Sequence, residues 1–455
     1  MVSFYDTVYN TVAAITALSP KDLRIGNTAS VQGVAKTLAA GAMSYYYGNA
    51  TTFVDLPTPY YWWECGALIG AMLDYSHYTN DSSYDKTLTT ALLAQVGPDF
   101  DFMLPSHYGD EGNDDQAFWG FAILAAAERN LLQPNATVPS WLQLGENIWN
   151  SLTGRWNTTN CGGGLLWQIF ASNPNGLNYK NSVSNGGLFQ ISARLYRATN
   201  NQTYLDWAEK VYDWSVGVGF VDSSFNVYDG ASAEDNCAEI NPLTFSYSLG
   251  IYLYGAAVMA NATGNSTWVD RTAGFVRATE SFFSPFDNAT NIMYEHACEE
   301  YGTCNTDMLS FKGYLSRFMW AATLMVPDVL SEVEALLHPS ATAAANACSG
   351  GLKGTTCGQK WYVGGFDNHV GLGQEMCALE TVHGLLVGQA APPLSAGEIE
   401  DVRTTATATS TLPASTTASA TSTPSASKNA AMGGVMPDQR WAGLGVIGAL
   451  AWGLV

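Results

Sequence analysis

Two adjacent carboxylates, Asp114 and Asp115, are the residues of this sequence best placed to do chemistry. They begin a segment that stays uncharged up to Glu128 and that carries Phe118 and Trp119 directly after the pair. Burial beside a like charge separates the pKa values of two carboxyl groups, so one ionises while the other keeps its proton. Such a pair can cleave a glycosidic bond, because the ionised group attacks and the protonated group donates to the leaving oxygen.

The two aspartates are predicted to lie in the first turn of a buried helix. Asn113 would be its N-cap and Gln116 its third residue, as in a capping box. Neighbouring helical positions diverge by about 100°, which allows carboxyl groups roughly 5 Å apart, the separation typical of retaining glycosidases. Acidic residues also occur at helix starts without any function, because the helix dipole favours negative charge there.

An aromatic run supplies a second candidate. Trp62, Trp63 and Glu64 follow Tyr60 and Tyr61 and lead into a helix with several small residues. Indole faces can stack on a sugar ring while a carboxylate binds hydroxyl groups. The alternative is that these are core aromatics beside a surface glutamate.

A third candidate is a polar group at the start of another predicted buried helix. Lys180, Asn181 and Asn185 lie where ordinary core positions would be apolar. No spacing typical of a metal site, a phosphate-binding loop, a serine elbow or a dinucleotide-binding turn occurs, so we expect neither a metal nor another cofactor. A formal net charge of -21 opposes binding to a nucleic-acid backbone.

The elements that must position these groups are predicted to be helices. Between residues 28 and 385 apolar residues recur at helical spacing, with little of the alternation typical of strands. A helix stop, a tight turn, a hydroxyl N-cap and an aromatic residue recur at 79–84, 199–204 and 263–268. With looser turns between them, the spacing is roughly 55 to 65 residues, enough for two helices and their loops.

Six such hairpins predict an all-α (α/α)6 toroid. Segment 114–128 is apolar nearly all round and would belong to an inner ring, whereas segment 204–215 is amphipathic and would belong to an outer ring. An open helical solenoid is the alternative.

Cysteines and glycosylation sequences indicate an oxidising compartment. Eight cysteines form an even set without zinc spacing. Short separations favour Cys298–Cys304 and Cys348–Cys357, because small loops close cheaply, and Cys161 is paired with Cys237. Asn-x-Ser/Thr sequences, the acceptors of N-linked sugar, begin at Asn49, Asn80, Asn135, Asn157, Asn201, Asn261, Asn265 and Asn288.

The C-terminal region is predicted to be a stalk and an attachment signal. Residues 404–427 are almost entirely Ser, Thr, Ala and Pro, a composition that cannot pack. Small residues from Asn429, a polar spacer and an apolar tail at 441–455 follow in the order of a glycosylphosphatidylinositol (GPI) signal. A tail-anchored membrane helix is the alternative, but the tail is shorter than the ~20 residues needed to span a bilayer.

Four segments follow from these boundaries. Residues 1–27 lack the usual features of a signal peptide. A catalytic domain at 28–390, a stalk at 391–428 and the GPI signal at 429–455, with attachment at Asn429, complete the chain. The expected location is the cell surface, with the membrane contacted through the anchor only.

Several long motifs resemble glycoside hydrolase family 76 over about residues 28 to 385: YYWWECGALIGAMLDY, GNDDQAFWGFAILAAAER, RWNTTNCGGGLLWQI, YKNSVSNG, YLDWAEKVYDW and SFKGYLSR. They are most similar to its fungal GPI-anchored branch of mannan endo-1,6-α-mannosidases. The resemblance implies an (α/α)6 barrel and a retaining reaction, with Asp114 as nucleophile and Asp115 as general acid/base. It also implies a set of cleft residues: Trp62, Trp63, Glu64, Asn113, Gln116, Lys180, Asn181, Asn185, Asp229, Lys312, Tyr314 and Arg317.

Three positions depart from the family pattern. Cys65 stands where Ala is expected, Cys377 stands where a small polar residue is expected, and Gly187 replaces a frequent Cys. The two additional cysteines lie on the first and last hairpins, which become neighbours when the ring closes. We therefore expect a Cys65–Cys377 disulfide.

Three functions remain open at this point. The chain could hydrolyse α-1,6-mannan, or it could transfer a mannose-containing GPI glycan onto the β-glucan of a cell wall. It could also be a catalytically silent glycan-binding wall protein, although the intact aspartate pair argues against this third interpretation.

Overall fold

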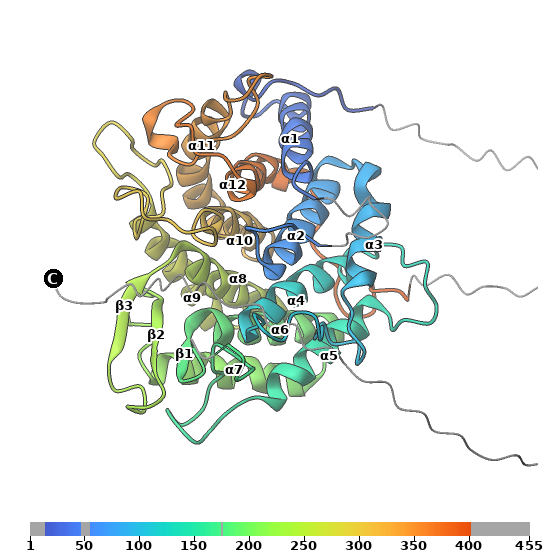
Figure 1. The fold of residues 1–455 in the computed structure, drawn as a ribbon, viewed down its shortest axis with the longest axis vertical. Coiled ribbons are helices and arrows are strands. Elements are labelled where there is room, and N and C mark those ends of the chain that lie inside the picture. The colour runs from blue at the N-terminus through green and yellow to red at the C-terminus, as the bar shows by residue number, and fades with distance from the viewer. Residues whose placement is uncertain (1–13, 47–54, 174–175, 402–455) are drawn as a thin grey trace, which may run out of the picture. The chain divides into compact units, whose positions relative to one another are not determined.

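Six helices surround a common axis and form the inner ring of the domain (Figure 1). The computed structural model describes residues 14–46, 55–173 and 176–401. The inner helices are α2 (Trp62–Thr79), α4 (Asn113–Ala127), α6 (Ser182–Thr199), α8 (Ser246–Thr263), α10 (Phe311–Met325) and α12 (Leu372–His383). Each contacts the next, and α12 contacts α2, so the ring is closed.

The remaining described α-helices form an outer layer against this ring. They are α1 (Thr28–Met43), α3 (Asp85–Ala94), α5 (Trp141–Gly154), α7 (Gln202–Gly217), α9 (Ser266–Ala278) and α11 (Leu330–Ala347). Helices α3, α5, α7 and α9 pack on the inner helices that precede them, while α1 and α11 pack on α12. The predicted all-α (α/α)6 toroid is confirmed, and ring closure rules out the open solenoid.

Short elements complete the described domain. An antiparallel sheet in the order β1-β2-β3 consists of β1 (Tyr179–Asn181), β2 (Tyr228–Ser232) and β3 (Ile240–Thr244). The 3-10 helices are η1 (Pro20–Asp22), η2 (Ser82–Tyr84), η3 (Thr279–Phe282), η4 (Pro327–Val329), η5 (Trp361–Val363) and η6 (Gly384–Gln389). Because β1 runs directly into α6, the sheet fixes where that inner helix begins.

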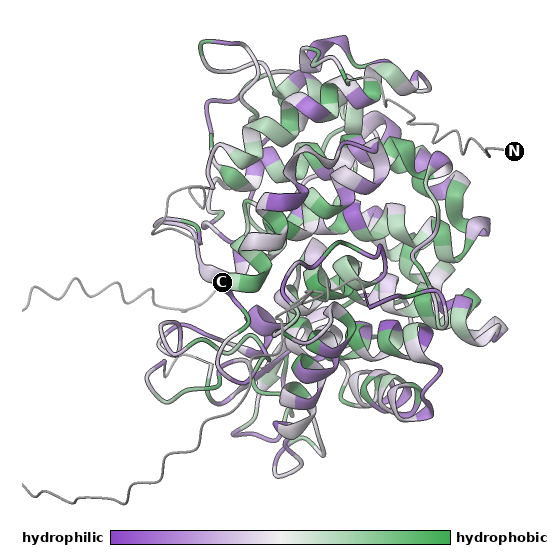
Figure 2. Cartoon of the chain, turned by 90° about the vertical axis from the view of Figure 1, so that its right-hand side faces the viewer, coloured by the Kyte–Doolittle hydropathy of each residue, from purple (hydrophilic) through white to green (hydrophobic). Residues whose placement is uncertain are grey.

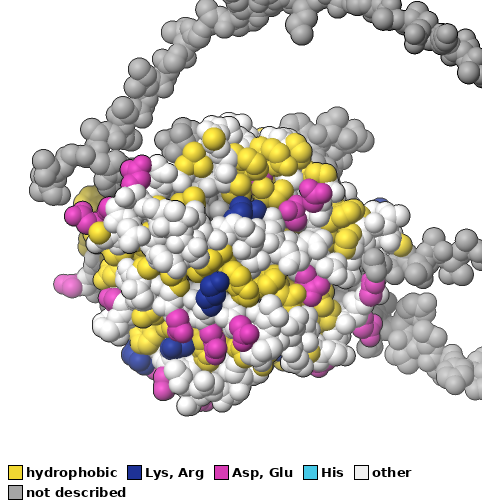
Figure 3. All heavy atoms as spheres, turned by 90° about the horizontal axis from the view of Figure 1, so that it is seen from below, with side chains coloured by type: hydrophobic (Ala, Val, Ile, Leu, Met, Phe, Trp, Pro, Cys, Tyr) yellow, Lys and Arg dark blue, Asp and Glu magenta, His cyan; other side chains and the backbone are white. Residues whose placement is uncertain are grey.

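Glycine residues allow neighbouring inner helices to approach closely. A Cβ on Gly187 of α6 would lie 2.6 Å from the Cβ of Ala117 on α4. A Cβ on Gly250 of α8 would lie 3.1 Å from the Cα of Leu315 on α10. Apolar residues run along the helices in Figure 2, and on the face drawn in Figure 3 a few basic side chains and scattered acidic ones lie among uncharged ones.

The recurring turns end inner helices and begin outer ones, as the sequence predicts. Asn200 and Gly264 adopt the left-handed conformation that stops α6 and α8. The N-caps of the next helices are the amides of Asn201 and Asn265 rather than the predicted hydroxyls. Their carboxamide oxygens accept from the backbone N–H groups of Thr203 and Thr267 at 3.0 and 2.9 Å.

The inner helices begin at one end of the ring, the open end, and finish at the other, the closed end. Residues 391–401, here called the strap, lie against the closed end. Arg197 near the end of α6 donates to the carbonyls of Pro393 and Leu394 at 2.7 and 2.9 Å. The backbone N–H of Leu394 donates to the carbonyl of Glu128 at 2.8 Å.

The strap contains the first residues of the predicted stalk, so this part of the stalk is packed on the domain. The Ser/Thr-rich segment 404–427, the predicted attachment residue Asn429 and the apolar tail lie outside the described residues. None of the described helices is long and apolar enough to cross a bilayer.

Three of the four predicted disulfides are confirmed, namely Cys161–Cys237, Cys298–Cys304 and Cys348–Cys357. The predicted Cys65–Cys377 pair is wrong, because both thiols are free and buried. Helices α2 and α12 are neighbours as expected, but the two sulfurs face different partners. Cys65 interacts with Asp55, whereas Cys377 Sγ lies 3.2 Å from the Gly313 amide nitrogen.

Alkylation of denatured but unreduced protein should therefore label Cys65 and Cys377 and no other cysteine. Native protein should resist labelling, because these side chains are 0% and 1% exposed. Peptide mapping by mass spectrometry checks both expectations, and reduction followed by labelling of all eight cysteines is the control. A disulfide-linked peptide pair containing Cys65 and Cys377 would contradict the structure.

Candidate active site

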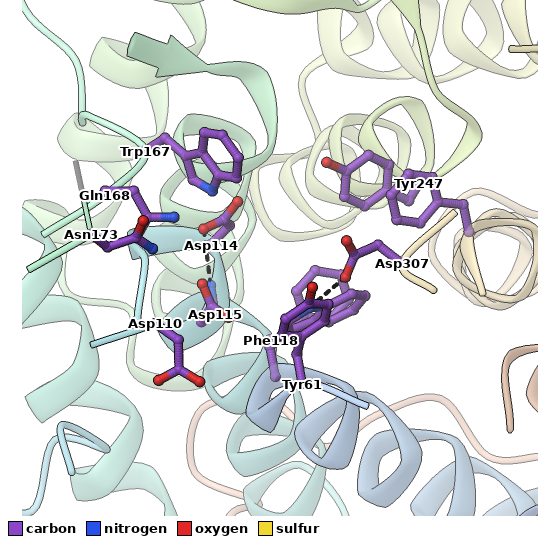
Figure 4. A pocket seen from close by; sticks show the side chains of 12 residues that line it. Tyr61, Asp110, Asp114, Asp115, Phe118, Trp167, Gln168, Asn173, Tyr247 and Asp307 are labelled. Carbon is purple, nitrogen blue, oxygen red and sulfur yellow. Dashed lines mark hydrogen bonds between the residues drawn. The ribbon is translucent and has the colours of Figure 1, made fainter. Parts of the chain in front are cut away.

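A cavity of about 290 Å³ opens at the starts of the inner helices (Figure 4). It is lined by Tyr61, Trp63, Asp110, Asp114, Asp115, Phe118, Trp167, Gln168, Asn173, Tyr247, Asp307 and Phe311. The lining set combines carboxylates with aromatic rings and contains no lysine or arginine. The described residues hold no group of His, Cys, Asp and Glu that could bind a metal ion.

Asp114 and Asp115 lie in the first turn of α4, one position later in the helix than the sequence suggests, because the helix begins one residue earlier. Gly112, not Asn113, is the N-cap. The Asp115 carboxylate accepts from the Gly112 backbone N–H at 2.8 Å, so Asp115 occupies the capping-box position expected for Gln116. The reason is that Asn113 already has helical geometry and its side chain turns to the loop, donating to the Leu166 carbonyl at 2.8 Å.

Asp114 receives two hydrogen bonds that hold its carboxylate in the cavity. Asn181 Nδ2 donates to Oδ2 at 3.1 Å, and the Asp115 backbone N–H donates to Oδ1 at 3.2 Å. Asn181 is itself fixed, because its Oδ1 caps α6 by accepting from the Ser184 N–H. Two neighbouring inner helices therefore position this carboxylate.

The two carboxyl groups have different proton affinities. Burial raises the pKa of Asp114 to about 6, and the Asn181 hydrogen bond opposes that rise. Burial, and next the charge of Asp114, raise the pKa of Asp115 well above its usual range. Asp115 is therefore the group of the pair that holds a proton more readily, the arrangement needed for attack by one group and proton donation by the other.

Aromatic side chains flank the carboxylates on more than one side. Trp167 lies beside Asp114 in Figure 4, while Tyr61 and Tyr247 lie across the cavity. Tyr61 is 47% exposed and Trp167 36% exposed, so both present ring faces to a ligand. Asp307 accepts from the Trp63 Nε1–H at 3.2 Å, and burial raises the pKa of this carboxyl.

Arg155 holds the first turn of α4 in place and was not identified from the sequence. Its Nε donates to Asn113 Oδ1 at 2.7 Å, and its Nη2 donates to Gln116 Oε1. Gln116 in turn donates to the carbonyl of Asp101 at 2.7 Å. Asn113 and Gln116 are therefore placed behind the aspartates, where they orient the turn, and not on the cavity wall.

Three predicted cleft residues on α2 and α10 lie next to the cavity wall. Trp62 is buried and donates to Gln95 at 2.8 Å. Glu64 accepts from the Tyr61 N–H at 2.8 Å, and burial raises the pKa of its carboxyl to about 8. Tyr314 packs edge-on against the rings of Trp63 and Phe118 that line the cavity.

The remaining polar candidates organise the loops of the open end. Lys180 Nζ donates to three backbone carbonyls of segment 157–163, and Asn185 binds both backbone groups of Leu165. Asp229 accepts from a tyrosine hydroxyl at 2.6 Å and an asparagine amide at 3.0 Å. Lys312 pairs with a buried glutamate at 2.7 Å.

Arg317 is not a cleft residue, which corrects the expectation from the resemblance. It lies toward the closed end and forms an ion pair with Asp74 at 2.5 Å. Arg129 pairs with the other oxygen of the same carboxylate. Burial alone would raise the pKa of Asp74, but the two arginines outweigh it and hold this pKa below its usual range.

Asp110, Trp167, Gln168, Asn173, Tyr247, Asp307 and Phe311 were also not identified from the sequence. Most of them lie in loops or at helix starts whose meeting depends on ring closure. The sequence could have indicated Trp167 and Gln168 as cavity residues, since this aromatic and this amide follow a run of three consecutive glycines.

A closed (α/α)6 ring whose cavity is lined by aromatic rings and adjacent carboxyl groups is typical of carbohydrate-active enzymes that use two carboxyl groups. The model for glycosyl hydrolase family 76 matches residues 30–397, and the chain belongs to this family. It is a glycoside hydrolase.

Relatives agree with this assignment. Mannan endo-1,6-alpha-mannosidase DCW1 of Saccharomyces cerevisiae is 44% identical over 365 residues, which cover 79% of this chain and 80% of the relative. The crystal structure of Dfg5 from Chaetomium thermophilum in complex with glucosamine matches with a TM-score of 0.78 at 38% identity, over 82% of this chain and 94% of that one.

A bacterial structure shares the fold at lower identity. It is an inactive variant of the alpha-1,6-mannanase GH76A of Salegentibacter sp. HEL1_6, with two consecutive aspartates replaced by asparagine, in complex with alpha-1,6-mannotriose. It matches with a TM-score of 0.62 at 20% identity, over 78% of this chain and 99% of that one.

Arg155→Lys should lower kcat by about a hundred-fold, because a single ammonium cannot bridge Asn113 and Gln116 and small misplacements of reacting groups are costly. Steady-state kinetics and thermal unfolding check this, and the melting temperature should fall only slightly. Ser151→Ala is the matched control, since it removes a third partner of Arg155 that lies on α5 and should leave kcat nearly unchanged. Wild-type kcat in Arg155→Lys would exclude this residue as a positioning group.

Proposed function

We propose that this chain is a mannan endo-1,6-α-mannosidase that cleaves α-1,6-mannosidic bonds with retention of configuration. One observation carries the mechanism: the carboxyl groups of Asp114, which is held by Asn181, and of Asp115 lie side by side in the cavity, and the pKa of Asp115 is raised well above its usual range. The printed activity of the fungal relatives supports the linkage, and the mannotriose in the bacterial relative supports a mannan substrate.

In the first step the Asp114 carboxylate attacks the anomeric carbon while Asp115 gives its proton to the departing glycosidic oxygen. A mannosyl ester of Asp114 forms, and Asp115 is left ionised. In the second step Asp115 takes a proton from an incoming hydroxyl, whose oxygen attacks the anomeric carbon and releases Asp114. Asp114 is therefore the proposed nucleophile and Asp115 the proposed general acid/base.

The incoming hydroxyl decides between hydrolysis and transfer. We propose that the physiological donor is a mannose-containing GPI glycan and that the acceptor is a sugar hydroxyl of wall β-glucan, so the enzyme acts as a transglycosidase. Exposed aromatic faces of Tyr61 and Trp167 support this, because a sugar stacked there would exclude water from the intermediate. We further propose a cell-surface location, with a GPI anchor at Asn429.

Asp114→Asn and Asp115→Asn should each lower activity on an α-1,6-mannooligosaccharide by about three orders of magnitude or more, while thermal unfolding stays close to wild type. An aryl mannoside whose leaving group needs no proton separates the two roles. Asp115→Asn should still form the intermediate and release the aryl group in a burst, whereas Asp114→Asn should not. A variant that keeps a tenth of wild-type turnover would remove that residue from the mechanism.

The pH dependence of kcat/KM should be bell-shaped. Activity should fall as pH drops through about 6, where Asp114 takes up a proton, and should fall again at high pH as Asp115 loses its own. Asn181→Asp keeps the acceptor that caps α6 but replaces the donor to Asp114 with a like charge, so the acid limb should move to higher pH. Asn178→Asp is the control, because that side chain faces Glu234. An unmoved acid limb in Asn181→Asp would contradict the assignment.

Product analysis tests the transfer proposal separately from the cleavage proposal. A labelled donor containing α-1,6-linked mannose is incubated with increasing β-glucan oligosaccharide. Labelled donor–acceptor conjugates should grow at the expense of free shortened mannosides. If only free mannosides form at every acceptor concentration, the chain cleaves the donor but does not transfer it, and the transglycosidase proposal is rejected. If no cleavage occurs at all, both the cleavage and the transfer proposals are rejected.

A further inference from the structure

Several of the Asn-x-Thr sequences share one local geometry. The side-chain Oδ1 of Asn135, Asn201 and Asn265 accepts from the backbone N–H of the threonine two residues later, at 2.9, 3.0 and 2.9 Å. Asn157 forms the same turn at 2.8 Å. In two of these cases the bond is also the N-cap of an outer helix, α7 or α9.

This turn uses only the oxygen of each side-chain amide. Within the described part of the chain, the Nδ2 groups of these four asparagines donate to no protein atom, and the side chains of Asn201 and Asn265 are exposed. A substituent on Nδ2 would leave the cap intact, since the oxygen keeps its bond. The amide can therefore stabilise a helix start and carry a bulky group at the same time.

Asn261 provides a contrast only four residues from Asn265. Its Oδ1 accepts from Arg197 Nε at 2.9 Å, and its Nδ2 donates to the carbonyl of Met325 at 3.3 Å. It lies inside α8, and the same Arg197 holds the strap. A substituent on this nitrogen would break the contact with the end of α10 and push against Arg197.

We propose that Asn135, Asn157, Asn201 and Asn265 carry N-linked glycans and that Asn261 does not. In the reaction Nδ2 bonds to the anomeric carbon of the first N-acetylglucosamine of an oligosaccharide carried on a lipid diphosphate. The lipid diphosphate leaves, and the amide proton is lost to a base. Three disulfides agree with passage through the oxidising compartment where this transfer takes place.

The proposed glycans are not spread evenly over the domain. Asn135, Asn201 and Asn265 lie in the turns that follow α4, α6 and α8, at the closed end, where the strap also lies. Asn157 lies in a loop of the open end. Most of the added bulk would therefore surround the strap, at the end of the ring opposite the cavity.

Mass spectrometry of the full chain, secreted from a yeast host behind a secretory leader, tests the proposal. Enzymatic release of N-glycans in heavy-oxygen water converts each occupied asparagine to a labelled aspartate, and electron-transfer fragmentation separates Asn261 from Asn265. We expect label at Asn135, Asn157, Asn201 and Asn265 and none at Asn261. Equal labelling of Asn261 and Asn265, or no labelling at any one of the four, would overturn the proposal.

Paired variants give an independent measurement. Thr267→Val removes the acceptor sequence of Asn265, and Thr263→Val removes that of Asn261. On electrophoresis, Thr267→Val should migrate faster than the wild type by the size of one glycan, and this difference should disappear when both proteins are first deglycosylated. Thr263→Val should migrate like the wild type. A mobility shift in Thr263→Val that disappears on deglycosylation would contradict the proposal, as would its absence in Thr267→Val.

Discussion

The close approach of the inner helices is the constraint on which the rest of the domain depends. At the contact of α10 with α12, a Cβ on Gly313 would lie 3.2 Å from the Cα of Cys377. A Cβ on Gly373 would lie 2.7 Å from the backbone of Leu309. Larger residues would widen the ring and separate the helix starts. The narrow ring brings together groups that are distant in the chain: Trp63, Asp114, Asn181, Tyr247 and Phe311.

Two buried aspartates, one toward each end of the ring, show opposite pKa shifts. At the closed end, Asp74 shares its charge with two arginines, and its pKa is low. At the open end, Asp115 has no cation among its cavity neighbours, and its pKa is high. The same residue type thus contributes a fixed ion pair in one place and a transferable proton in the other, because cations surround only one of them.

The sequence predicts features that depend on local pattern. Helical periodicity and recurring turns gave the ring, and adjacency in the chain gave the aspartate pair. How far along a helix a residue lies from the cavity was harder to predict. Phe311 begins α10 and lines the cavity, but Arg317 lies six residues further, about 9 Å along the axis. A motif that spans both residues does not show which of them reaches the site.

The sequence pattern also did not predict how each helix is rotated about its own axis, and therefore which way its side chains face. Helices α2 and α12 are neighbours, as ring closure implies, yet the sulfurs of Cys65 and Cys377 each face a different part of the chain. Arg155 and Asp307 were missed for a related reason. Each lies outside a regular helix, and each meets its partner only after the ring has brought separate loops together.

The strap determines how the domain would bear mechanical load. Tension applied at residue 401 would reach α6 through the Arg197 bonds to Pro393 and Leu394, and α4 through the Glu128 carbonyl, before it reached α12. Because α12 makes the contact with α2 that closes the ring, pulling on the chain end would not act first on the ring's seam. The force would be shared by two helices in the middle of the sequence.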